Sequence, residues 1–256
     1  RALFAADPVA DGAVLGISAG IAVLSSLLVG TGELRPQKIA ADFQTSSLLS
    51  IDRGAVTQHP DPNAATYSNI GLYAVVGYAA LDPILSGLRE KNTRTFLVDF
   101  MIYGESLAIT ESLTNVAKFA VRRPRPYAYI QHFANPKADN NSTDSNLSFF
   151  SGHASAAGAV TATATYLAFE RSRHSWRPWA TLLVGTGITT FIDIERVRAA
   201  DHFPTDVITG TLVGAGVGVL TVRLHRTDEQ RPRPMWIGWQ PARVGDGGAL
   251  TLSGLL

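Results

Sequence analysis

The sequence has no cysteine and almost no net charge, and each absence excludes a class of function. Without cysteine the chain cannot form disulfides, use a thiolate nucleophile or bind zinc through sulfur. Its 22 Lys and Arg residues against 21 Asp and Glu residues give a net charge of +1, and no basic tail is present. A nucleic-acid partner is therefore not expected, and any cationic cluster must be local.

Long uncharged or amphipathic stretches dominate the 256 residues, which are enough for one large helical domain. The pattern predicts helices over residues 12–30, 70–88, 95–121, 151–171, 179–194 and 203–224. Asp82-Pro83 predicts an interruption of the second helix. The uncharged run 12–30 fits either a membrane span or a buried helix rich in small residues, and we favour burial, because a mean hydropathy of +0.10 is modest for a polytopic protein.

Two segments differ from the helical pattern. Residues 127–148 form a long polar stretch, expected to be either a substrate-reading lid or a surface excursion. Residues 236–256 place the glycine-rich run 244–248 between two apolar-polar alternations, which predicts a β-hairpin. We therefore expect an all-α helical domain over 1–230 and a C-terminal extension over 231–256, whose hairpin packs on the same domain.

Three short motifs carry candidate chemistry. Lys118 and Arg125 place two cations on backbone that Pro124 and Pro126 restrict, which suits a phosphate. Taken alone, this motif is more typical of ordinary cationic capping at a helix C-terminus. Ser151-Gly152-His153 opens a helix, where free backbone N–H groups and the helix dipole attract anions; an ordinary serine cap with an incidental histidine is the alternative. The third motif consists of Arg196, His202 and Asp206.

His202 and Asp206 are four residues apart, which places them on one helix face. We expect the Asp206 carboxylate to accept the Nδ1–H of His202, leaving Nε2 with its lone pair. The alternative is a surface His–Asp pair beside a solvated Arg196. Taken together, the three motifs supply three cations, a helix N-terminus and two histidines, a set sufficient for phosphoryl transfer without a metal.

The combined pattern Lys118-x6-Arg125-Pro126, Ser151-Gly152-His153 and Arg196-x5-His202-x3-Asp206 resembles the type 2 phosphatidic acid phosphatase superfamily. That superfamily includes bacterial non-specific acid phosphatases, lipid phosphate and pyrophosphate phosphatases, and vanadium haloperoxidases. Two positions depart from the usual pattern: Phe150 stands where proline is common and Glu195 where serine is common. Glu195 is expected to pair with Arg196 or to reduce the positive field of the site.

The resemblance implies a single helical bundle and a metal-independent phosphatase that needs no cofactor, with vanadate able to bind as a phosphate mimic. His202 would be the nucleophile, His153 the general acid and base, and Asp206 the orienting group. The residues expected to hold the phosphate are Lys118, Arg125, Ser151, Gly152 and Arg196. The expected substrate is a phosphate monoester or pyrophosphate, lipid-linked in the favoured case.

Two other functions remain open: a vanadate-dependent haloperoxidase, and a non-catalytic envelope protein that retains only a phosphate-binding motif. The first residue is Arg1, as expected of a processed or trimmed chain. We expect an exported protein of the periplasm or cell envelope, at or near a membrane surface, with an integral membrane protein as the alternative. His132 is expected to border the pocket, whereas His59, His174 and His225 are expected at the surface.

Overall fold

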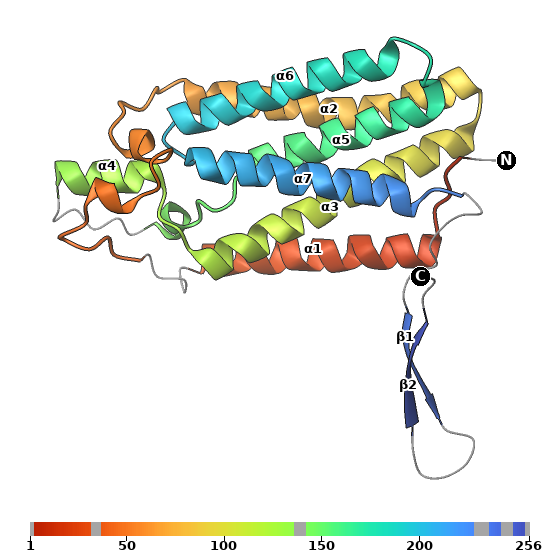
Figure 1. Cartoon of the computed structure of the whole chain (residues 1–256), viewed down its shortest axis with the longest axis horizontal. Coiled ribbons are helices and arrows are strands. Elements are labelled where there is room, and N and C mark those ends of the chain that lie inside the picture. The colour runs from red at the N-terminus through yellow and green to blue at the C-terminus, as the bar shows by residue number, and fades with distance from the viewer. Residues whose placement is uncertain (1–2, 32–36, 136–141, 228–235, 242–247, 254–256) are drawn as a thin grey trace.

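Six long helices lie side by side in the computed structural model, which describes residues 3–31, 37–135, 142–227, 236–241 and 248–253 (Figure 1). They are α1 (Pro8–Gly30), α2 (Ala64–Glu90), α3 (Thr93–Val121), α5 (Gly152–Ser172), α6 (Arg177–Arg198) and α7 (Pro204–Leu224). The short helix α4 (Pro126–Ala134) lies at one end of the bundle, near the 3-10 turns Thr45–Ser47, Arg53–Val56 and Thr143–Asn146. The prediction of an all-α bundle is confirmed.

Helix α5 lies at the centre and packs against α2, α3, α6 and α7. Helices α5 and α7 approach closely because a glycine of each helix faces the backbone of the other. A Cβ at Gly214 would overlap the Ser155 carbonyl, and one at Gly158 would overlap the Thr211 carbonyl. Small residues let two helix backbones approach in this way, so the N-termini of α5 and α7, which carry two of the motifs, are held close together.

The bundle buries hydroxyl groups beside an apolar core that includes Ile102, Leu167 and Ile192, and it also exposes many large apolar side chains. Within it, Thr163 donates to Ser106 at 3.1 Å, and the Thr114 and Ser155 hydroxyls lie 3.0 Å apart. The outer face of the long helices exposes large apolar side chains, among them Ile70, Tyr73, Leu97, Phe100, Leu183, Val184, Leu212 and Leu220. Within the part of the chain that the structure describes, three helices, α1, α2 and α7, are long and apolar enough to cross a membrane. This surface indicates association with a membrane.

Several expectations about the elements need correction. Helix α1 is not buried: only 12% of its most apolar window lies inside the structure, because it packs mainly on α3. Helix α2 continues through Pro83 without interruption. Within 127–148, residues to Ala134 form α4 and Thr143–Asn146 form a 3-10 turn, whereas 136–141 lie outside the described residues.

The C-terminal hairpin is present as predicted. Strand β1 (Trp236–Pro241) pairs with β2 (Gly248–Ser253) in antiparallel register, with Trp236 opposite Ser253 and Pro241 opposite Gly248. Its packing against the helical domain stays a prediction.

Candidate active site

The cationic motif follows from the way α3 ends. Arg122 adopts the left-handed conformation (φ 50°) at the C-cap, and Pro124 cannot continue a helix. Lys118 therefore lies in the last turn of α3, and Arg125 becomes the N-cap residue of α4. The two cations reach the same end of the bundle from two different helices.

Arg125 is buried and its guanidinium is held on both sides. Its Nε donates to the Asp144 carbonyl at 2.9 Å, one terminal nitrogen to the Asp144 carboxylate at 2.8 Å, and the other to the Asp201 carbonyl at 3.2 Å. These bonds use three of the five N–H groups of an arginine. The fork is therefore fixed in position, and its bonds to the described residues leave two donors over for an anion.

The second motif forms the tip of α5. Ser151 is the N-cap, and its Oγ accepts from the Ala154 N–H at 3.4 Å, so its own hydroxyl hydrogen remains available to donate. Lys118 approaches this tip: a Cβ built at Gly152 would be in ordinary contact with Lys118 Nζ and with the Glu111 carboxylate, each 3.8 Å away. Lys118 thus stands directly over the N-terminus of α5, where a helix attracts an anion.

His153 is oriented by a residue that the sequence patterns did not indicate. Its Nε2 lies 2.7 Å from the side-chain oxygen of Asn69 on α2. Because an amide oxygen can only accept, this contact places the ring hydrogen on Nε2. Asn69 has no sequence signal of its own, since a single asparagine within an apolar helix fits many roles.

His202 is fully buried in the connection between α6 and α7, and its tautomer is set by Ser148. The imidazole Nδ1 lies 2.8 Å from the Ser148 carbonyl oxygen, so Nδ1 carries the hydrogen and Nε2 keeps its lone pair. The expected direct bond to Asp206 is not the main one, because the nearer carboxylate oxygen is 3.8 Å from Nδ1. The expected tautomer is present, with a different acceptor.

Asp206 instead holds the groups around the histidine. Its Oδ2 accepts from the Ser148 hydroxyl at 2.5 Å and from the Phe203 N–H at 3.0 Å, and its backbone carbonyl accepts from Ser151 N–H at 3.1 Å. The carboxylate lies in the first turn of α7, where it accepts the N–H of the N-cap residue Phe203 and where the helix dipole favours a negative charge. Asp206 therefore acts on His202 mainly through Ser148.

Arg123 lies between Lys118 and Arg125 in the sequence. It is a second residue that the sequence patterns did not indicate as functional. It donates to Asp206 at 2.6 Å and to Asp52 at 2.8 Å, and its guanidinium stacks over the Phe203 ring at 3.8 Å. Asp52 also accepts from the Thr205 hydroxyl at 2.7 Å. This buried network fixes the start of α7 against the end of α3.

Arg196 is buried beside the same site. It pairs with Asp201 at 2.9 Å and donates to the Ser68 hydroxyl at 3.4 Å, whereas its Nε has no hydrogen-bond partner among the described residues. The expected pairing of Glu195 with Arg196 does not occur. Glu195 pairs with Arg198 at 2.7 Å, three residues along α6, so it leaves the Arg196 charge to Asp201 and the site.

Contacts between the three motifs show that they converge. The Ser151 N–H donates to the Asp206 carbonyl at 3.1 Å, a Cβ on Gly152 would lie 3.8 Å from Lys118 Nζ, and Arg125 donates to the carbonyl of Asp201, the residue before His202, at 3.2 Å.

Burial, assisted by the positive charges of Arg125, Arg196 and Lys118, lowers the pKa of His202 from 6.5 to about 3, although the Asp206 carboxylate opposes the shift. His202 is therefore a neutral imidazole in the ligand-free protein. The two arginines are buried rather than solvated, which contradicts the surface alternative.

Comparison with known proteins decides the family. The PAP2 superfamily model matches residues 99–230, which include all three motifs. The chain belongs to the PAP2 superfamily. It is 32% identical over 148 residues to phospholipid phosphatase 2 of Bos taurus, covering 50% of each chain, and 28% identical over 139 residues to an undecaprenyl-diphosphatase of Sulfolobus acidocaldarius, covering 54% of this chain and 59% of that one.

The resemblance inferred from the motifs is thus confirmed, and a solved PAP2 structure confirms the fold. The structure superposes with a TM-score of 0.51 on the transmembrane PAP2-type phosphatidylglycerolphosphate phosphatase of Bacillus subtilis, at 19% sequence identity. The match covers 80% of this chain and 93% of the Bacillus subtilis chain. The chain spans about half the length of the curated relatives it matches.

Proposed function

We propose that this PAP2 protein is a metal-independent phosphatase that hydrolyses lipid-linked phosphate monoesters or pyrophosphates through a phosphohistidine at His202. One observation carries the proposal: the Nδ1–H of buried His202 bonds to the Ser148 carbonyl at 2.8 Å, which frees Nε2 as a nucleophile among three cations. A site that only bound phosphate would not need an imidazole held in this tautomer.

In the first step, the Nε2 lone pair of His202 attacks phosphorus while the bond from phosphorus to the leaving oxygen breaks. The phosphoryl oxygens are held by Lys118, Arg125, Arg196, the Ser151 hydroxyl and the Gly152 N–H. Protonated His153 gives its proton to the leaving oxygen, which departs as an alcohol or a phosphate. The negative charge of the bound substrate favours the protonated form of His153.

In the second step, water attacks the phosphohistidine and His153 takes the proton of that water. The phosphorus–nitrogen bond breaks, and its electron pair returns to Nε2 of His202. Inorganic phosphate leaves, so both histidines return to their starting protonation states. Asn69, bonded to His153 Nε2 in the ligand-free protein, holds that ring in place until substrate enters.

The apolar outer face of the bundle supports a lipid substrate and an integral membrane location. Helices α1, α2 and α7 each have the length and hydropathy of a membrane span, and the large side chains they expose would face lipid. The names of the relatives, a phospholipid phosphatase and an undecaprenyl-diphosphatase, point to the same substrate class. We place the protein in the cell envelope; extraction of membranes with alkaline carbonate should leave it in the pellet, and its release would argue for a peripheral protein.

Hydrolysis by two matched variants tests the activity. We expect His202→Ala to lose turnover of a phospholipid phosphate monoester, while His174→Ala, which alters an exposed histidine, keeps the wild-type rate. Phosphate release from His202→Ala at a near wild-type rate would overturn the nucleophile assignment. EDTA should leave the wild-type rate unchanged, because cationic side chains rather than a metal hold the phosphate.

A further inference from the structure

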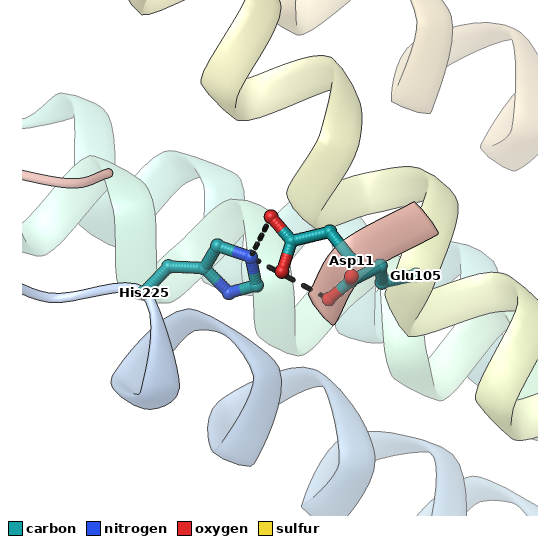
Figure 2. A group of neighbouring side chains, drawn as sticks. All are labelled: Asp11, Glu105 and His225. Carbon is teal, nitrogen blue, oxygen red and sulfur yellow. Dashed lines mark ion pairs between the residues drawn. The ribbon is translucent and has the colours of Figure 1, made fainter. Parts of the chain in front are cut away.

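A second cluster of ionisable side chains lies at the opposite end of the bundle from the histidine pair. Asp11 comes from the first turn of α1, Glu105 from α3 and His225 from the C-cap of α7 (Figure 2). All three are buried, with 7%, 4% and 6% of their surface exposed, so the expected surface position of His225 is wrong. The 21 residues of α7 separate His225 from His202 by about 30 Å, so this cluster is no part of the proposed active site.

The imidazole of His225 presents a free nitrogen to both carboxylates. Its Nδ1 lies 2.8 Å from the Thr221 carbonyl oxygen, which places the ring hydrogen on Nδ1 and the lone pair on Nε2. Nε2 lies 3.5 Å from Asp11 Oδ2 and 3.5 Å from Glu105 Oε2 (Figure 2). A backbone bond that fixes one ring nitrogen and frees the other is the usual setting of a metal-ligating histidine.

Two buried atoms of the cluster point into it without a hydrogen-bond partner. Among the described residues, neither His225 Nε2 nor Glu105 Oε1 forms a hydrogen bond. A buried polar atom left without a partner costs about 1–3 kcal/mol, and more when it is charged. Two such atoms at one place indicate that something else binds there.

The spacing of the three groups fits a small divalent cation. One ligand atom from each residue lies within 4.8 Å of the others. In a tetrahedral site with bonds of 2.0–2.2 Å, ligand atoms lie about 3.3–3.6 Å apart, which agrees with the 3.5 Å from Nε2 to each carboxylate. One imidazole with two carboxylates suits Zn²⁺ or a similar transition metal better than Mg²⁺ or Ca²⁺, which prefer oxygen ligands alone.

We propose that Asp11, Glu105 and His225 bind one structural divalent transition-metal ion of the Zn²⁺ class. The ion would balance the two carboxylate charges, which an imidazolium balances only in part. It would also join α1, which packs mainly on α3, to the end of α7. The site is independent of the proposed phosphatase activity.

Metal content and stability in matched variants test the site. Detergent-purified protein, stripped with chelator and dialysed against Zn²⁺, should retain one more equivalent in wild type and His174→Gln than in His225→Gln. Zn²⁺ should raise the unfolding temperature of the first two proteins and leave that of His225→Gln unchanged. His174 is exposed, so its loss removes one imidazole without altering the cluster.

Cobalt substitution gives a readout that does not depend on stability. Bound Co²⁺ should show the visible absorption of a low-coordinate site in wild type and His174→Gln, and lose it in both His225→Gln and Glu105→Gln. Equal Zn²⁺ content in wild type and His225→Gln, or a Co²⁺ spectrum that survives both substitutions, would overturn the proposal and leave the cluster as an ion-paired triad.

Discussion

The Nδ1 atom of His202 lies 2.8 Å from the Ser148 carbonyl oxygen, 1.0 Å closer than it lies to the Asp206 carboxylate at 3.8 Å. The backbone thus sets the tautomer, and Asp206 supports it by accepting the Ser148 hydroxyl at 2.5 Å. This arrangement separates two tasks that a directly bonded aspartate would combine: holding the ring and balancing its charge.

The supporting role of Asp206 predicts a moderate effect on catalysis. Asp206→Asn should lower kcat by about 10–100-fold, the range for groups that orient a ligand from behind, rather than the ~10⁴-fold expected for a directly bonded aspartate. Ser148→Ala keeps the carbonyl but removes the hydroxyl through which Asp206 acts, so it should lower kcat by a similar factor. A loss in Asp206→Asn as large as that in His202→Ala would show that Asp206 acts on the imidazole directly.

Arg123 should matter more for stability than for chemistry. It neutralises Asp52 and Asp206, both of which have 0% exposure, so removing it leaves buried carboxylates unpaired. We expect Arg123→Ala to lower the free energy of unfolding by about 3–5 kcal/mol. Thermal unfolding in detergent, with exposed Arg94→Ala as control, measures this; equal unfolding temperatures for the two variants would contradict the network.

Asn69 should position His153 for proton transfer. Asn69→Ala removes the acceptor 2.7 Å from Nε2 and should reduce kcat by about 10–100-fold with little change in KM, because substrate contacts remain. Asn63→Ala provides the control, since Asn63 lies at the N-cap of the same helix and its side chain makes no capping bond. A change confined to KM would place Asn69 in substrate binding instead.

The low pKa of His202 predicts an acid-dependent loss of stability. The folded protein holds this histidine neutral down to about pH 3, whereas the unfolded chain takes up a proton near 6.5. The unfolded state therefore binds more protons between these values, and stability falls as pH is lowered from 6.5 towards 3. The unfolding temperature of His202→Gln should fall less between pH 7 and pH 4.5 than that of the wild type. Parallel plots of unfolding temperature against pH for the two proteins would contradict the lowered pKa of His202.

Activity should follow pH in a related way. Burial and the nearby cations lower the pKa of both His202 and His153 to about 3 in the free protein. Titration of His202 should therefore not limit kcat/KM above about pH 5. The alkaline loss of kcat should report deprotonation of His153 in the substrate complex, where the negative charge of the substrate favours its protonated form. A bell-shaped profile whose acid limb lies below pH 5 is expected. An acid limb near the ordinary histidine value would show that His202 titrates as a solvated group.

The sequence predicted those parts of the site that short spacings encode. Helix periodicity located α3 to within two residues of its observed start. The segments that carry Lys118, Ser151 and Asp206 lie together at one end of the bundle, and the roles of these residues stay a prediction. Asn69, Ser148 and Asp52 were missed because each acts through one contact with a distant segment, and a single polar residue carries no periodic signal. Arg123 had a weak signal, as one of the arginines beside Pro124.

The exposure of α1 was mispredicted for a physical reason. An uncharged run such as 12–30 has the same composition whether protein or lipid surrounds it, so only its packing distinguishes the two. In the structure α1 contacts mainly α3 and leaves Val23, Leu24 and Leu27 exposed. The buried position of His225 was likewise invisible, because its partners come from residues 11 and 105.

Rapid quenching of the enzyme during turnover, followed by peptide mass spectrometry under alkaline conditions that preserve phosphohistidine, tests the central claim most directly. We predict one phosphoryl group on His202 in the wild-type protein, accumulating further when His153→Ala slows its hydrolysis. A phosphoryl group on any other residue, or turnover with no phosphoenzyme in either protein, would contradict a covalent mechanism at His202.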